Sequence, residues 1–392
     1  MRRTLMLKNQ ELLDFDVDVA TGEIRILDAP GADDAQLMSL GLGGPDRETI
    51  VATVIQGRRL SSQRVDVDEV LEAFGASSGL ELVFRGHGLS FTDKIWYRAP
   101  GSTERWEDLN FYDHDWDDTF RTAILADDYG QLAQCSPDIP DVTTAGHLRK
   151  VWERSEGCVQ LVKEPLFESG VDLEGAWLGA ELCRLLFGQD AYQPLRIVER
   201  AGRRFSASPL MVGRDEELVQ GMRLFAMDGY DTTKTIALMG HAPSQDLIDI
   251  FVRAGVVNAS AHVAKLLVFK DLALLQDIHA GNFGIIRNID TGACRPAPPF
   301  DYDRSFGFPS EEFSFERYCK DPRFAAFICA AAFSDLDASW DWSWYDPHVL
   351  EGFEDRIMPA YAGYTDVPAN FGDLVRRLFV MQRGYVNGIA LA

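Results

Sequence analysis

The segment 274–304 limits the possible folds more than any other part of this 392-residue chain. Apolar residues at helical spacing fill 266–275, and a polar stretch at 277–282 then interrupts them abruptly. Phe283, Ile285 and Ile286 restore a strand-like pattern before an Asp-Thr-Gly turn signal at 290–292. The sequence therefore predicts a helix, a polar loop and a short hairpin, in that order.

Three residues with carboxylate or amide side chains lie in the polar loop and after the hairpin. Asp277 and Asn282 lie five residues apart in the polar loop, and Asp301 follows an Ala-Pro-Pro-Phe run. The order suits ATP-dependent phosphoryl transfer, because one carboxylate can accept the proton of an attacking hydroxyl while an amide and a second carboxylate hold Mg²⁺. An Asp–Asn pair at this spacing also arises by chance in a chain of this length. The residues alone leave open a phosphotransferase and a structural loop with ordinary turn carboxylates.

Composition limits the partners and the environment of the chain. Its hydrophobic content of 46% can fill a large core, and its formal net charge of −23 opposes a broad phosphate-binding surface. We therefore expect no direct contact with nucleic acid. The six cysteines form no close pairs, and no apolar run approaches the roughly 18 residues of a membrane span. These features predict a soluble, cytoplasmic protein with reduced cysteines and no membrane contact.

The N-terminal region predicts a β-rich subdomain. Alternating apolar and polar residues predict strands over 12–18 and 23–27, with a turn between them. A helix is expected over 66–74, where Gly75 stops it.

The segment 136–164 predicts two strands that are joined by a turn at 155–157. A small polar loop that ends at Gly146 precedes the first strand, and such loops let backbone N–H groups approach phosphates closely. Lys163, in an apolar strand, is the candidate to bridge the α- and β-phosphates of a nucleotide, and Lys150 could reach a phosphate from the loop. The alternative for Lys163 is an edge-strand lysine that points to water.

Helical patterns follow these strands. The run 173–188 carries Glu174 and Glu181, either of which could be the acid partner that a buried lysine needs. Apolar patterns over 324–333 and 372–386 predict further helices that support the C-terminal half.

Several motifs of the chain together resemble the HipA-like kinase family. They occur in the family's order, at 88–96, 106–112, 136–152, 161–163, 277–284 and 297–301. The resemblance implies an α+β, two-lobed protein-kinase-like fold, with an N-terminal β-rich subdomain over 1–130, a kinase N-lobe over 131–212 and a helical C-lobe over 213–392. It also implies ATP and Mg²⁺ as cofactors, a serine or threonine of a protein as acceptor, and an antitoxin-type partner.

The resemblance also assigns roles to particular residues. It makes Asp277 the catalytic acid, Asn282 and Asp301 the Mg²⁺ ligands, Lys163 the ATP lysine and the loop 146–150 the cover of the phosphates. The nucleotide-binding residues that it implies are Gly146, Lys150, Lys163, Glu181, Ser208, Leu210, Met211 and His279.

Residues 208–211 fall where the hinge to the second lobe is expected, so their backbone would face adenine. Three features qualify the assignment. Ile278 stands where members of the family often have Arg or Ala, which leaves open a nucleotide-binding pseudokinase, and a transferase that acts on a small molecule is a further alternative. Asp303 could compete for the metal role. Thr143 and Thr144 are the nearest equivalents of a serine that some family members autophosphorylate.

Overall fold

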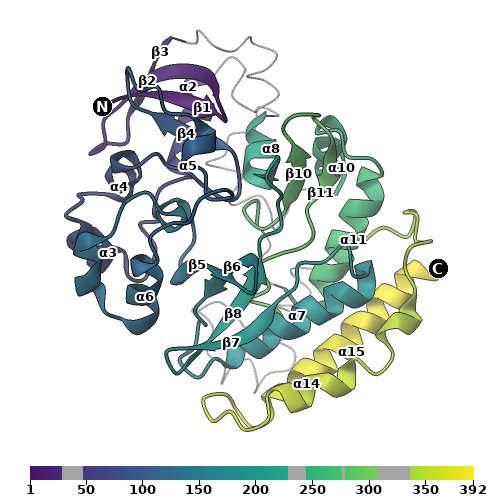
Figure 1. Ribbon diagram of the computed structural model, residues 1–392. Helices are drawn as coiled ribbons and strands as arrows, with labels where there is room; N and C mark the ends of the chain where they lie inside the picture. The colour runs from purple at the N-terminus through teal and green to yellow at the C-terminus, as the bar shows by residue number, and fades with distance from the viewer. Residues whose placement is uncertain (29–46, 228–243, 276–278, 308–335) are drawn as a thin grey trace.

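The computed structural model describes residues 1–28, 47–227, 244–275, 279–307 and 336–392 (Figure 1). Over these ranges the chain forms three antiparallel sheets with helices packed around them. The α+β class that the sequence predicts is confirmed.

The N-terminal sheet has the strand order β3-β2-β1-β4. Its strands are β1 (Arg2–Leu7), β2 (Gln10–Val17), β3 (Ile24–Asp28) and β4 (Ile95–Arg98). In β2 the side chains of Leu13, Phe15 and Val17 are buried while Asp14 and Asp16 face outward, as strand alternation requires. The two strands predicted for this region are therefore confirmed.

Short helices complete the N-terminal region, and most of them share a hydrophobic core with its sheet. They are α2 (Arg47–Gln56), α3 (Val67–Phe74), α4 (Gly79–Arg85), α5 (Trp106–Leu109) and α6 (Thr119–Ala126), followed by the 3₁₀ turns η1 (Tyr129–Gln134) and η2 (Pro140–Thr143). Helix α3 ends at Gly75, whose φ of 59° lies in the left-handed region that favours glycine. The helix therefore ends at the glycine that the sequence predicted to stop it.

The central sheet has the order β5-β6-β8-β7. Its strands are β5 (Lys150–Ser155), β6 (Cys158–Lys163), β7 (Arg196–Arg200) and β8 (Arg203–Pro209). Glu156 and Gly157 form the predicted turn between β5 and β6, and both have positive φ, as tight two-residue hairpins require. Val151 and Val162 share a hydrophobic core with Phe120 of α6, so one face of this sheet packs against the N-terminal helices.

Helix α7 (Val171–Phe187) follows β6 and lies against the helical C-terminal part of the chain (Figure 1). That part contains α11 (Ala259–Leu272), η3 (Pro347–Leu350), α14 (Glu354–Ala360) and α15 (Phe371–Ala390). Buried residues of α7, α11 and α15 form one hydrophobic core. Helix α15 confirms the helix predicted over 372–386, whereas the helix predicted over 324–333 lies outside the described residues.

The third sheet has the order β11-β10-β9 and lies beside α8 (Gly221–Met227), α10 (Ser244–Arg253) and α11 (Figure 1). Its strands are β9 (Glu216–Gln220), β10 (Gly284–Asn288) and β11 (Cys294–Pro296). The turn predicted at 290–292 joins β10 to β11, and Gly292 adopts a φ of 72° there. The predicted helix and hairpin are therefore confirmed, and the polar loop between them lies partly outside the described residues.

Two further expectations concern the whole chain. Within the described ranges, none of the helices is both long and apolar enough to cross a membrane. Cys135, Cys158, Cys183 and Cys294 are free thiols, and the other two cysteines lie outside the described residues.

Candidate active site

Lys163 lies at the end of β6 and forms ion pairs with two carboxylates. Its Nζ atom is 2.7 Å from Oδ1 of Asp301 and also contacts Oδ2 of Asp303. The three side chains are 13%, 32% and 20% exposed, respectively. Strand β6 is an interior strand between β5 and β8. Lys163 is thus a largely buried, doubly paired lysine and not an edge-strand lysine that points to water.

Lys150 lies directly opposite Lys163 in the β5–β6 ladder. Because successive side chains alternate, the two lysines occupy the face of the sheet opposite to Val151 and Val162. Lys150 is buried, and its Nζ lies so close to Gly146 that a Cβ on that glycine would be 2.2 Å from it. Gly146 has a φ of 117°, which L side chains rarely adopt. The loop before β5 therefore lies directly against the Lys150 ammonium group because it has glycine at this position.

The four charged groups shift one another's pKa. Burial opposes ionisation of Asp301, but the ammonium groups of Lys163 and Lys150 outweigh it and hold the pKa of this carboxyl well below its usual range. Burial raises the pKa of Asp303 to about 6, against the attraction of Lys163. Burial also lowers the pKa of Lys150 to about 7, and repulsion from Lys163 acts in the same direction. For Lys163 the two acids outweigh burial and raise the pKa.

The backbone around the two acids is held by Tyr302, which is buried between them. Its hydroxyl lies 2.7 Å from the carbonyl oxygen of Pro299 and 3.1 Å from that of Gln193, and its single proton is shared between these two acceptors. Asp301 has a φ of 62°, an uncommon value for a residue with a side chain. Because Tyr302 is anchored to the core, the carboxylates on either side of it both reach Lys163.

Helix α7 packs closely on the same segment but brings no glutamate to Lys163. A Cβ at Gly179 would lie 2.7 Å from Oγ of Ser305, so the helix approaches this segment through a glycine. The two glutamates of α7 have other partners. Glu174 accepts from Arg204 and from the Tyr364 hydroxyl, each at 2.7 Å, and Glu181 pairs with Arg184 at 2.9 Å and with Arg356 at 3.5 Å. The sequence left the choice between these glutamates open, and the structure places neither in contact with Lys163 among the described residues.

The polar loop before β10 is described from His279 onward, and Asp277 and Ile278 lie outside the described residues. The backbone N–H of Gly281 donates to Nδ1 of His279 at 3.0 Å, and the N–H of Asn282 donates to the His279 carbonyl oxygen at 2.8 Å. Asn282 is buried. These bonds make a tight turn that presents Asn282 directly before the strand.

The expected hinge connects the central sheet with the third sheet. Ser208 pairs with Leu161 in the ladder, and the Leu210 N–H donates to the carbonyl oxygen of Val159 at 2.8 Å. Leu210 and Met211 then pack on a cluster of Val212, Ile286 and Ala297. Ser208 therefore belongs to the central sheet, and Leu210 and Met211 lead from it to the third sheet; the hinge role stays a prediction.

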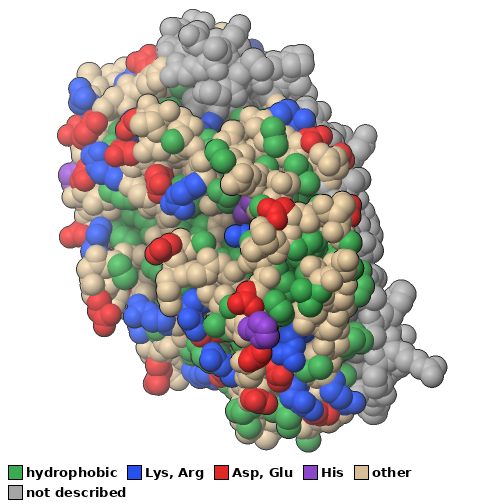
Figure 2. All heavy atoms as spheres, turned by 90° about the vertical axis from the view of Figure 1, so that its right-hand side faces the viewer, with side chains coloured by type: hydrophobic (Ala, Val, Ile, Leu, Met, Phe, Trp, Pro, Cys, Tyr) green, Lys and Arg blue, Asp and Glu red, His purple; other side chains and the backbone are tan. Residues whose placement is uncertain are grey.

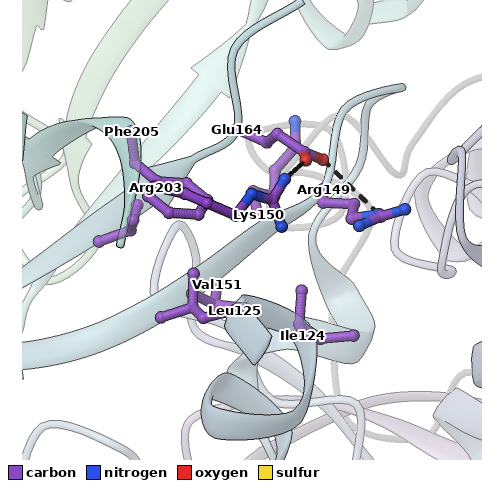
Figure 3. Close-up of a pocket in the computed structure, with 9 residues that line it drawn as sticks. Ile124, Leu125, Arg149, Lys150, Val151, Glu164, Arg203 and Phe205 are labelled. Carbon is purple, nitrogen blue, oxygen red and sulfur yellow. Dashed lines mark hydrogen bonds and ion pairs between the residues drawn. The ribbon is translucent and has the colours of Figure 1, made fainter. Parts of the chain in front are cut away.

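A separate pocket lies beside Lys150, between helix α6 and the central sheet (Figure 3). Its lining combines apolar side chains of α6 and the central sheet with an ionic network in which Glu164 pairs with Arg203 and Arg149. Figure 3 shows Ile124 and Leu125 below the strand and the charged groups above it. These contacts join the N-terminal helices to the sheet.

No family model and no curated protein matches the chain. Among the solved structures that are similar to it is a Helicobacter pylori proinflammatory kinase, CtkA, with 11% identity, a TM-score of 0.45, and coverage of 62% of this chain and 92% of that one.

Another is HipA of the Shewanella oneidensis MR-1 toxin–antitoxin system, in complex with HipB and operator DNA. It has 13% identity and a TM-score of 0.48, and the match covers 100% of this chain and 99% of that one. A HipA protein is thus among the structures to which the chain is similar, as its motifs led us to expect.

Proposed function

We propose that the chain is an ATP- and Mg²⁺-dependent HipA-like kinase that transfers the γ-phosphate to a serine or threonine hydroxyl of a protein, itself included. The observation that carries the proposal is the ion pair between Lys163 and Asp301. These residues come from segments 138 positions apart and meet at the face of the central sheet that the N-terminal core leaves free. A lysine on an interior strand beside an acid that follows a catalytic-type loop is the arrangement of ATP sites in kinases.

The described residues fit a Mg²⁺ ion by the chemistry of their donors. Asn282 offers an amide oxygen and Asp301 a carboxylate, the hard oxygen ligands that Mg²⁺ accepts together with phosphate oxygens. The lowered pKa of Asp301 keeps its carboxylate ionised at neutral pH. A bound Mg²⁺ would neutralise negative charge on the triphosphate.

The other residues would bind and orient ATP. In this proposal Lys163 and Lys150 donate to phosphate oxygens, and the loop around Gly146 supplies backbone N–H groups above them. The backbone of Ser208, Leu210 and Met211 would face adenine. Asp277 would accept the proton of the acceptor hydroxyl, with His279 shaping the turn that follows it.

We further propose an antitoxin-type protein as a partner. The proposal is supported by the motif resemblance of the sequence. On the face shown in Figure 2, acidic and basic side chains lie interspersed. The absence of direct nucleic-acid contact by this chain stays a prediction from its net charge of −23.

The decisive experiment is incubation with ATP labelled at the γ-phosphate and Mg²⁺, followed by intact-mass analysis. We expect phosphate on the wild type, or on added protein substrates, and none with Asp277→Ala or Asp301→Ala. Asp355→Ala, at an exposed position on α14, is the matched control and should behave as the wild type.

Three other outcomes would contradict the proposal. Turnover that survives in Asp277→Asn with normal ATP binding would refute the role of Asp277. An adenylate adduct would show nucleotidyl transfer. ATP that raises the melting temperature with no transfer to any acceptor would favour the pseudokinase that Ile278 suggests.

A further inference from the structure

We propose that Asp303 is the acid that positions Lys163 for the nucleotide, in place of a glutamate from helix α7. The inference rests on the proposed function, because it concerns how the ATP lysine is held. In protein kinases this lysine pairs with a glutamate of a helix, and the pair must be in place for activity. Here the two acids that Lys163 contacts come from the same short segment.

The contacts of α7 leave no glutamate for this task among the described residues. Glu174 is held by Arg204 and Tyr364, which belong to β8 and to the C-terminal part. Glu181 is held by Arg184 and Arg356. Their carboxylates thus stabilise the position of the helix itself.

A third acid of α7 is also engaged. Asp172, in the first turn, accepts from the backbone N–H groups of Leu166 at 2.7 Å and Phe167 at 3.2 Å. It therefore fixes the connection between β6 and α7. It shapes the surroundings of Lys163 without an ion pair to it.

The two acids that do reach Lys163 have different chemical tasks in the proposed function. Asp301 must turn its carboxylate to Mg²⁺ when the nucleotide arrives, so it cannot remain the main partner of the lysine. Asp303 is two residues further on, directly after the anchored Tyr302, and also contacts Lys163. An ammonium group has three N–H donors, so Lys163 can keep one on Asp303 and turn the others to phosphate oxygens.

One consequence concerns regulation. Because the positioning acid and the proposed metal ligand share the segment 301–303, the lysine follows that segment and not helix α7. A swing of α7 would not break the ion pair, in contrast to kinases in which the helix carries the glutamate.

The first test compares kinetic constants. Asp303→Asn keeps the shape of the side chain and removes its charge, so we expect the KM for ATP to rise at least about tenfold, as for loss of a charge-assisted hydrogen bond. The kcat should change much less, because the lysine would be misplaced in ground state and transition state alike. Asp303→Glu should recover part of the loss. Asp301→Asn should instead remove kcat, and Asp355→Asn is the inert control.

The second test needs no nucleotide. Removal of Lys163 leaves the two carboxylates without the cation that they both contact, so Asp303→Asn should be clearly more favourable to the melting temperature in the Lys163→Met background than in the wild type. This coupling between the two changes would identify the ion pair in the folded protein, and additive effects would exclude it. If a variant fails to fold, the melting curves themselves show it, and Asp303→Glu supplies the kinetic comparison.

Several results would overturn the inference. One is an unchanged KM for Asp303→Asn in a wild type that binds ATP. Another is a large rise in KM for Glu174→Gln or Glu181→Gln without one for Asp303→Asn. A third is a strongly increased Mg²⁺ requirement of Asp303→Asn at saturating ATP, which would make Asp303 a metal ligand. A wild type that does not bind ATP overturns the proposed function and, with it, the nucleotide part of this inference. Coupling between Asp303→Asn and Lys163→Met in melting temperature would then show that the ion pair stands and that the failure lies in the proposed function.

Discussion

Replacement of Lys163 by methionine is the perturbation that tests the charge cluster most directly. It removes the cation between Asp301 and Asp303 and leaves an apolar side chain of similar length. Removal of one partner from a buried ion pair lowers the free energy of unfolding by about 3–5 kcal/mol. Because the two acids are partly exposed, we expect a loss at the lower end of this range, about 3 kcal/mol. For a cooperative chain of 392 residues, an unfolding entropy of about 2.1 cal/mol/K per residue converts this loss to a fall in Tm of about 4 °C.

Lys8 provides a matched control, because it also pairs with two carboxylates. Its Nζ is 2.8 Å from Asp215 and 3.0 Å from Asp290, but these acids are 44% and 59% exposed. Exposed pairs contribute about 0–1 kcal/mol, so Lys8→Met should lower Tm by about 1 °C or less. Scanning calorimetry at pH 8 measures both variants.

The pH dependence of Lys163→Met supplies a second check on the same reasoning. Without the lysine, Asp301 and Asp303 take up protons more readily, so the deficit in Tm should shrink between pH 8 and pH 5. Equal deficits for the variants of Lys163 and Lys8, or a deficit that does not depend on pH, would refute the view that these carboxylates are buried and depend on one cation.

Three further predictions concern single titratable groups. Burial raises the pKa of Asp141 to about 7, so the folded protein loses stability as the pH rises toward 7 and this carboxyl ionises. In urea unfolding, the free energy of unfolding of Asp141→Asn should therefore gain on the order of 2 kcal/mol over that of the wild type between pH 5 and pH 8. The hydrogen bond to Asp138 raises the pKa of His87. The stability that the protonated imidazole contributes is therefore full below about pH 6.5 and is lost as the pH rises through the pKa of the folded state. His87→Gln should flatten this pH dependence of the urea midpoint between pH 6 and pH 9. Burial lowers the pKa of Lys150 to about 7, so this amine is mostly neutral at pH 8 and should take up a proton when the phosphates of ATP bind beside it. Calorimetry would show the uptake as a binding heat that varies with the buffer, and Lys150→Met should abolish it.

The local elements of the fold were predictable because each depends on a few neighbouring residues. Gly75 ends α3, and the Glu156–Gly157 turn joins β5 to β6, since both positions require a left-handed backbone that the sequence signals with glycine. The hairpin after residue 283 follows from alternating apolar residues and a turn motif. These features required no knowledge of tertiary contacts.

The partner of Lys163 was not predictable in the same way. Asp303 was considered only as a rival metal ligand, because its contact with Lys163 joins segments 140 residues apart, and strand or helix periodicity carries no information about that distance. The available signal was the two-residue spacing of Asp301 and Asp303, but strand alternation does not explain their convergence, because Asp301 has a left-handed backbone. The roles given to Asp277, Asn282 and the hinge residues stay predictions.

The two acids also explain how a buried ATP lysine is accommodated before the nucleotide binds. An ammonium group at the position of Lys163 would lose its hydration without gaining partners if both acids were absent, and such a charge is costly to bury. Asp301 and Asp303 satisfy it in the structure. A triphosphate would bring oxygens that replace those of Asp301 around the lysine, while the released carboxylate becomes available to the metal. Binding would then exchange one set of charged partners for another, so neither the lysine nor Asp301 is left unpaired in either state, and the affinity for ATP is not reduced by the cost of an isolated buried charge.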